Sequence, residues 1–148
     1  MLREKTIGII IFKREGQSIR YLLLHHGGEY WNFPKGRQEK DETEIESALR
    51  ELQEETGISD IKIIEGFRDE YDYDFDSEVR SGERKKVYKT AIFFLGEVKD
   101  QTVKISDEHL DFGWFDFDTA LKRMFYQEGQ NSLKRAKQFL LKQQGFVL

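Results

Sequence analysis

Residues 36–58 read GRQEKDETEIESALRELQEETGI, and they place several carboxylates on one side of a short predicted helix. Asp41 is followed three residues later by Glu44, the spacing of a capping box, so we expect the helix to begin near Glu42. Gly57 stands where a left-handed residue would end the helix. Between these ends runs an apolar stripe at helical spacing, made of Ile45, Ala48, Leu49 and Leu52.

Three glutamates, Glu51, Glu54 and Glu55, share an arc of this helix beside the apolar stripe. Their mutual repulsion costs roughly 0.2–0.5 kcal/mol per neighbouring pair, and a divalent cation would offset it. Oxygen donors without His or Cys nearby suit Mg²⁺, for which Mn²⁺ can substitute, and such a site supports metal-assisted attack of water on a phosphate chain. An exposed glutamate-rich helix is the alternative, but it explains neither the two glycines nor the spacing.

Gly36, Glu42 and the run RELQEETGI at 50–58 resemble the Nudix box at every fixed position. The resemblance implies an α/β/α sandwich with a mixed β-sheet, whereas periodicity alone supports only a mixed α/β domain. It also implies that a backbone carbonyl at Lys35–Gly36 is a metal ligand and that Arg50 orients the glutamates, with Glu42 in support. Glu42 and Arg50 are too far apart for i, i+4 pairing along a helix, so we expect each to have other partners.

The composition limits the class of protein. The 148 residues form the length of one domain, so we expect a single domain over residues 1–148. A net charge of −4 does not favour a stable nucleic-acid complex or membrane binding. The absence of cysteine excludes disulfides, thiol catalysis and zinc–thiolate sites, and the lack of a long apolar run or a secretory pattern predicts a cytoplasmic protein.

The first part of the chain predicts a β-hairpin. Residues 6–12 and 19–24 are apolar and β-branched, and the first of these strands is expected to be central. His25 and His26 are expected at a solvated strand end, since neighbours in a strand point to opposite faces and would hardly share one ion. Pro34 stiffens the approach to Gly36, and Lys35 is expected either to bind a phosphate or to face solvent.

A second group of strands follows the helix. Residues 61–67 are expected to form one strand, and in residues 68–75 aromatic and acidic side chains alternate, which gives a strand one aromatic face. These aromatics either belong to the core of a sheet edge or form a platform on which bases stack. The base-stacking candidates are Tyr73, Phe75, Phe93 and Trp31.

Residues 77–86 are expected to form a basic loop, with a turn at Ser81–Gly82, before a strand at 87–95. The loop carries Arg80, Arg84, Lys85 and Lys86, and it either meets a polyphosphate opposite the metal site or is a solvated hairpin. The candidates for binding substrate phosphates are Lys35, Lys89, Lys86 and Arg84.

The last part of the chain contains one strand, at 112–115, and two helices whose apolar stripes are expected in the core. Asp118 is expected to cap the first of these helices and Asn131 or Ser132 the second. By the family resemblance, Glu108 is the candidate for an additional metal-binding or base carboxylate, with His109 second. The stripe residues are Ala120, Leu121, Met124 and Phe125, then Leu133, Ala136, Phe139 and Leu140.

Within the family, four segments resemble the asymmetric diadenosine tetraphosphate hydrolases: residues 29–36, 63–67, 89–100 and 107–120. That resemblance implies Mg²⁺-dependent hydrolysis of diadenosine tetraphosphate to ATP and AMP. Phe93 stands where some members have a tyrosine that stacks on adenine.

The expected catalytic set is Glu51, Glu54, Glu55, Glu108 and Arg50, and the expected metal ligands are Gly36, Glu51, Glu54, Glu55 and Glu108. Either Glu51 or Glu108 accepts the proton of the attacking water, while Lys35 and Lys89 neutralise charge on the phosphates. The alternative activities are removal of pyrophosphate from RNA 5′ ends or from nucleoside triphosphates. A nucleotide-sensing module without hydrolysis is the alternative from a different class.

Overall fold

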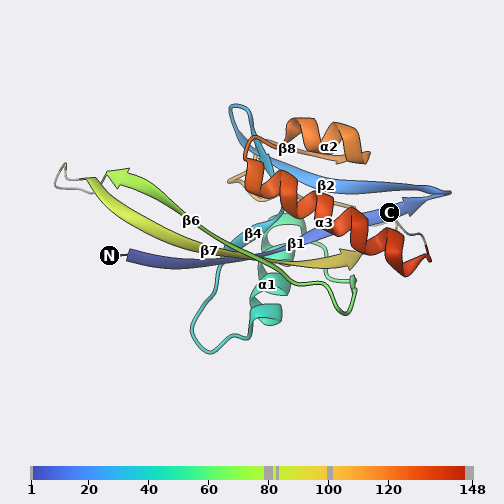
Figure 1. Cartoon of the computed structure of the whole chain (residues 1–148), viewed down its shortest axis with the longest axis horizontal. Coiled ribbons are helices and arrows are strands. Elements are labelled where there is room, and N and C mark those ends of the chain that lie inside the picture. The colour runs from blue at the N-terminus through green and yellow to red at the C-terminus, as the bar shows by residue number, and fades with distance from the viewer. Residues whose placement is uncertain (1, 79–81, 83, 100–101, 146–148) are drawn as a thin grey trace.

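The computed structural model describes residues 2–78, 82, 84–99 and 102–145. Its described strands form one mixed, eight-stranded sheet, and helices cover both faces (Figure 1). The strands are β1 (Leu2–Glu15), β2 (Ser18–Gly27), β3 (Tyr30–Asn32), β4 (Lys35–Arg37), β5 (Lys62–Ile63), β6 (Asp69–Glu78), β7 (Arg84–Glu97) and β8 (Asp111–Phe115). The helices are α1 (Glu44–Thr56), α2 (Phe117–Arg123) and α3 (Gln127–Gln143).

Strand β1 is central, as its apolar sequence predicts. It pairs in parallel with β7 along one edge, and antiparallel with β4 and β2 along the other. The hairpin to β2 turns at Gly16, whose φ of 61° suits a glycine. Both expected strands of this hairpin are confirmed, and both extend beyond their expected ends.

The alternation of side chains along β1 separates two cores. The odd-numbered Ile7, Ile9 and Ile11 pack toward α1, and the even-numbered Ile10 and Phe12 pack toward α2 and α3. Each of these side chains is fully buried, and burial of each contributes about 1.5–3 kcal/mol to the stability of the folded state. The resulting three layers confirm the α/β/α sandwich with a mixed sheet (Figure 1).

Helix α1 begins later than the sequence predicts. Thr43 is the N-cap, and it forms a capping box with Glu46 rather than the expected box of Asp41 with Glu44. Asp41 instead lies in the turn before the helix with a φ of 67°, where its side chain cannot cap. Gly57 ends the helix in the left-handed conformation, as predicted, with a φ of 74°. Leu49 is 37% exposed, so the buried stripe is narrower than expected.

Other element boundaries also differ from the sequence-based predictions. The strand expected at 61–67 contains only β5, because the chain turns at Gly66 with a φ of 93°. Asp116, and not Asp118, caps α2. Helix α3 begins at Gln127, ahead of both expected caps, and Ser132 lies inside it. Phe125, expected in the core, lies between these helices and is 60% exposed.

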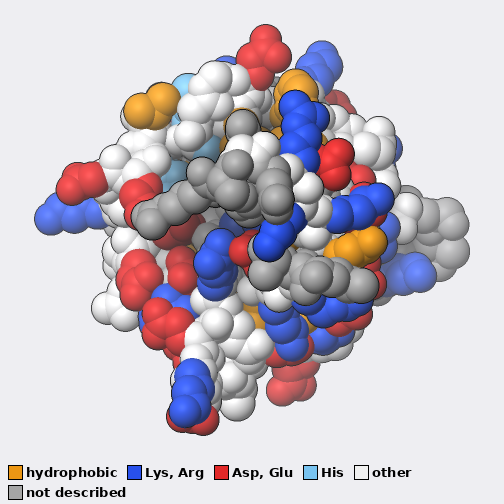
Figure 2. All heavy atoms as spheres, turned by 90° about the vertical axis from the view of Figure 1, so that its left-hand side faces the viewer, with side chains coloured by type: hydrophobic (Ala, Val, Ile, Leu, Met, Phe, Trp, Pro, Cys, Tyr) orange, Lys and Arg blue, Asp and Glu red, His pale blue; other side chains and the backbone are white. Residues whose placement is uncertain are grey.

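Strands β6 and β7 form a long antiparallel hairpin that extends past the helices together with the start of β1 (Figure 1). The expected basic loop is therefore shorter, since Ser77 and Glu78 belong to β6 and Arg84–Lys86 belong to β7. Arg80 lies outside the described residues. The end of the molecule that carries this hairpin bears charged side chains of both signs (Figure 2). Among the described residues, no helix is long and apolar enough to cross a membrane.

Replacing Thr43 with Ala is expected to lower the free energy of unfolding by about 1 kcal/mol, because it removes the helix cap. Asp41→Gly is the matched control and should not destabilise the protein, since glycine favours a positive φ. Urea unfolding of both variants measures the difference. The opposite order of stabilities would contradict the observed cap.

Candidate active site

The last turn of α1 buries a carboxyl group beneath strand β4. Glu55 is 8% exposed, and its Oε2 accepts a hydrogen bond from the Lys35 backbone N–H at 3.0 Å. Burial raises the pKa of Glu55 to about 8, with the negative charge of Glu51 adding to this effect and the Lys35 N–H opposing it. A nearby cation would therefore stabilise the ionised form of Glu55, which burial disfavours.

Glu51 occupies the space that a side chain at position 36 would fill. A Cβ on Gly36 would lie 2.0 Å from the Glu51 Cδ, so only glycine lets this carboxylate reach the β4 backbone. The Glu51 side chain is 14% exposed, and burial raises its pKa although Arg50 opposes the change. Glu51 and Glu55 thus approach the Lys35–Gly36 backbone together.

Arg50 holds the glutamates in place. Its Nη1 donates to Glu51 at 2.8 Å and to Glu54 at 3.2 Å, in keeping with the expected orienting role. Contrary to expectation, it also pairs directly with Glu42, with 2.6 Å between Nε and Oε2. Glu42 precedes α1, so the helical spacing rule does not apply to Glu42 and Arg50, and the turn before the helix brings them together. This pairing lowers the pKa of Glu42 to about 2 and raises that of Arg50.

These donors fit a hard divalent cation. Carboxylate oxygens and a backbone carbonyl at Lys35–Gly36 are the ligand types that Mg²⁺ takes, and the raised pKa of Glu55 marks a buried carboxyl short of positive charge. In the described part of the chain, no three His, Asp or Glu side chains are already gathered as a cation site. Arg50 instead neutralises Glu51 and Glu54, and Glu54 is largely exposed.

The two candidates near position 108 differ in environment. Glu108 is exposed in a turn, yet close enough to raise the pKa of Glu55. His109 is 7% exposed; its Nε2 lies 3.8 Å from the Glu55 Oε1, and its Nδ1 is hydrogen-bonded to the Ser106 hydroxyl.

The expectation of a solvated histidine pair is wrong for His26. Its Nε2 is buried without a hydrogen-bond partner, and burial lowers its pKa to about 3. The ring packs against His109 at a centroid distance of 4.6 Å. His25 turns to the opposite face and stacks on Trp31 at 4.7 Å.

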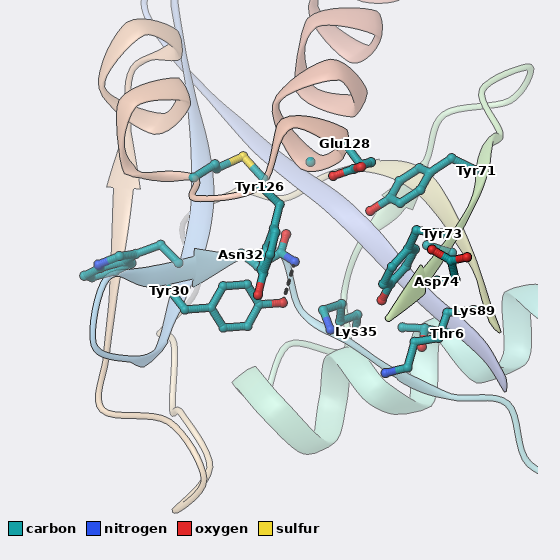
Figure 3. A pocket seen from close by; sticks show the side chains of 14 residues that line it. Thr6, Tyr30, Asn32, Lys35, Tyr71, Tyr73, Asp74, Lys89, Tyr126 and Glu128 are labelled. Carbon is teal, nitrogen blue, oxygen red and sulfur yellow. Dashed lines mark hydrogen bonds between the residues drawn. The ribbon is translucent and has the colours of Figure 1, made fainter. Parts of the chain in front are cut away.

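A cavity of about 480 Å³ is lined by Lys35, whose backbone N–H donates to Glu55 (Figure 3). Tyr71 and Tyr73 of β6 form one side of it, and Tyr30 of β3 and Tyr126 at the start of α3 lie across from them. Lys35 and Lys89 line its end nearest α1. The other lining residues are Thr6, Trp31, Asn32, Asp74, Ala91, Met124, Glu128 and Gly129.

The structure brings only some of the candidates to this cavity: Lys35, Lys89, Tyr73 and Trp31. Arg84 and Lys86 are exposed on the other face of β7 from Lys89, because side chains alternate along a strand, and Lys86 pairs with Asp74 at 3.4 Å. Neither lines the cavity, and their expected phosphate role stays a prediction.

Phe93 is fully buried between Phe33 and Tyr71, so its expected contact with a base is also wrong. The side chain of Phe75 lies outside the described residues.

Sequence reasoning did not single out several lining residues. Tyr71 belongs to the same alternating strand as Tyr73, so that pattern could have found it. Tyr126 and Glu128 carry no such signal, because they lie where α3 begins and only the fold brings them to β6. Asn32 donates to the Tyr30 hydroxyl at 3.0 Å, a contact drawn as a dashed line in Figure 3.

Comparison with known proteins identifies the family of this chain. The NUDIX domain matches residues 2–136. The rat asymmetrical bis(5′-nucleosyl)-tetraphosphatase is 37% identical, covering 92% of this chain and 95% of the rat protein. A Caenorhabditis elegans Ap4A hydrolase in a binary complex superposes with a TM-score of 0.78 at 26% identity, covering 97% of this chain and 99% of that one. An RNA pyrophosphohydrolase of Bartonella clarridgeiae is 30% identical over 67% of this chain and 65% of its own length.

The chain belongs to the Nudix family, and it is a pyrophosphohydrolase of that family. Across nearly its whole length it is similar to the asymmetrical bis(5′-nucleosyl)-tetraphosphatases, as the sequence motifs predict. Nudix hydrolases use divalent metal ions, which accords with the oxygen donors of α1.

Gly36→Ala is expected to lower kcat by about 100-fold, because the new methyl group displaces the Glu51 carboxylate. Gly16→Ala in the β1–β2 turn is the control: it meets no atom within 4 Å, so any loss of stability there should leave kcat unchanged. Steady-state kinetics and thermal unfolding separate the two effects. Near-normal kcat for Gly36→Ala would contradict the close approach of Glu51 to β4.

Glu55→Gln is expected to make the chelator-treated protein more stable above about pH 8. The folded state keeps the Glu55 proton up to about pH 8, whereas the unfolded chain loses it near pH 4.5, so wild-type stability falls as pH rises between these values. Glu55→Gln should not show this fall in stability with rising pH. Glu54→Gln, which replaces an exposed glutamate, should still show it. Thermal unfolding against pH tests the idea, which fails if Glu55→Gln is the less stable protein at high pH.

Proposed function

We propose that this enzyme hydrolyses diadenosine tetraphosphate to ATP and AMP with Mg²⁺ as its cofactor, for which Mn²⁺ can substitute. The observation that carries the proposal is the junction of two features: an aromatic cavity with two lysines at one end, and the Glu51–Glu55 carboxyl pair beside that end. The similarity to the rat and nematode enzymes supports the choice of substrate.

The tyrosines of the cavity suit one nucleoside. A base between the Tyr71–Tyr73 side and the Tyr30–Tyr126 side stacks on aromatic rings, which contributes about 1–3 kcal/mol per base. Tyr30 and Tyr126 already meet edge to face at 5.3 Å, so the aromatic side near α3 is formed before substrate binds.

The lysines suit the phosphates. Lys35 directly precedes Gly36, and Lys89 lies across the cavity end, 3.5 Å from Glu4. A polyphosphate that leaves the cavity at this end meets both ammonium groups and then the carboxyl pair. Lys35 and Lys89 thereby neutralise charge that develops on the phosphate chain.

Glu51, Glu54, Glu55 and the backbone carbonyl at Lys35–Gly36 would hold the divalent cation. When bound, it polarises a phosphate oxygen and makes water more acidic. Water adds to a phosphorus atom as the bond to the bridging oxygen breaks, and one carboxylate accepts the proton. We assign that proton to Glu51, whose pKa is raised by burial above that of an ordinary carboxyl group, and Glu108 remains the alternative acceptor.

Removal of pyrophosphate from RNA 5′ ends is the second candidate, favoured by the similarity to the Bartonella enzyme. A cytoplasmic location, the lack of a stable nucleic-acid complex and a single domain over residues 1–148 stay predictions from the sequence.

Product analysis distinguishes these activities. Purified protein is given diadenosine tetraphosphate, a triphosphorylated short RNA or nucleoside triphosphates, each with Mg²⁺ and with chelator. We expect release of ATP and AMP from the dinucleotide to be the fastest reaction and to stop with chelator. Faster release of pyrophosphate from RNA would reject the proposed substrate while keeping the metal chemistry.

Glu51→Gln is expected to lower kcat by about 10²–10⁴-fold and to remove the acidic limb of the pH–rate profile, because the proton acceptor is lost. Glu108→Gln should retain that limb. The reverse pattern would assign the proton to Glu108.

A further inference from the structure

The two sides of the cavity belong to elements that meet only through tertiary contacts. Tyr71 and Tyr73 belong to β6, while Tyr126 directly precedes α3 and Glu128 and Gly129 lie in its first turn (Figure 3). The distance between these elements decides whether a ring fits between them.

A polar cluster of two buried residues, Asp69 and Ser132, and the exposed Arg135 joins β6 to α3. Asp69, the first residue of β6, is 8% exposed. Its Oδ1 accepts from Arg135 Nε at 2.6 Å, and its Oδ2 accepts from Arg135 Nη2 at 2.8 Å and from the Ser132 hydroxyl at 2.5 Å. The two hydrogen bonds from Arg135 fix the orientation of α3 as well as its distance from β6, and loss of Arg135 would leave the buried Asp69 carboxylate without its cation.

The cluster lies next to the cavity on both elements. Asp69 is two residues before Tyr71, on the same face of β6 by strand alternation. Ser132 lies on α3 less than one turn after Gly129, which lines the cavity. Gly129 permits close packing there, since a Cβ would stand 2.7 Å from the Met124 Cε. The catalytic carboxylates lie on α1, whose apolar side packs against the opposite face of the sheet, and they belong to neither of these two elements.

We infer that the Asp69–Arg135–Ser132 cluster is a positioning device that sets the spacing between the tyrosine sides of the cavity and so determines nucleotide affinity. The inference rests on the proposed function, in which the cavity holds a nucleoside. The residues of a binding site need to be held within about 0.5 Å of their productive geometry, so a loosened α3 weakens binding. The cluster includes none of the carboxylates of α1, so the chemical step stays intact.

Arg135→Gln tests the inference, with Lys134→Gln as the matched control, because Lys134 is an exposed cation on the same helix. For Arg135→Gln we expect KM for diadenosine tetraphosphate to rise about tenfold with kcat within about twofold of wild type. Calorimetric Kd for AMP, measured with chelator, should rise by the same factor. Arg135→Lys keeps the charge but loses the pair of hydrogen bonds from the guanidinium. Its KM and its AMP Kd should lie between those of the wild type and of Arg135→Gln.

An unchanged KM for Arg135→Gln, or an equal loss of kcat, overturns the inference even if the melting temperature falls. If that variant does not fold, Ser132→Ala decides the question: it removes one neutral donor and should raise both KM and the AMP Kd about threefold, and unchanged values reject the role. Wild-type protein that neither binds AMP nor hydrolyses the dinucleotide would instead reject the proposed function.

Discussion

The hydrogen bond from the Lys35 N–H to the Glu55 carboxyl is the contact on which the site depends. It joins the last turn of α1 to β4 at 3.0 Å, and it places an ionisable group where only 8% of it is exposed. That position requires α1 to pack closely against the sheet. Ala48 and Leu52 provide this packing. It also requires a glycine at position 36, because Glu51 fills the space beside the same strand.

The carboxylates of this region are not equivalent, and the differences arise from the environment of each. Glu42 accepts hydrogen bonds from two nitrogens of Arg50 and from the Ser47 hydroxyl, so its charged form is strongly favoured. Glu55 has one backbone N–H and a low-dielectric surrounding, so its neutral form is favoured. Arg50 thus stabilises the charged form of Glu42, whereas the buried Glu55 carboxyl is left for another cation.

The sequence predicts the parts of the site that depend on local spacing. The glutamates, Gly36 and Gly57 follow from the helix period and the box motif, and the central strand follows from its continuous apolar run. The cap does not, since both Asp41 with Glu44 and Thr43 with Glu46 satisfy the same rule, and only the turn conformation of Asp41 decides between them.

Contacts between distant segments are harder to predict. Phe93 and Lys89 lie on the same predicted strand, yet Phe93 is covered by Phe33, which belongs to the segment after β3. Tyr126 reaches the cavity through the packing of α3, which is also joined to β6 by Asp69 and Arg135, a pair separated by 66 residues. No periodic pattern marks such a pair, because its partners are brought together by the packing of whole elements.

The central claim is that Glu55 is a buried, protonated carboxyl that a divalent cation ionises. Calorimetric titration of Mg²⁺ at neutral pH, repeated in buffers of different ionisation enthalpy, counts the protons released on binding. The account predicts release of about one proton per bound site, falling away above about pH 8 as Glu55 ionises without the cation. Mg²⁺ binding without proton release at neutral pH would contradict it.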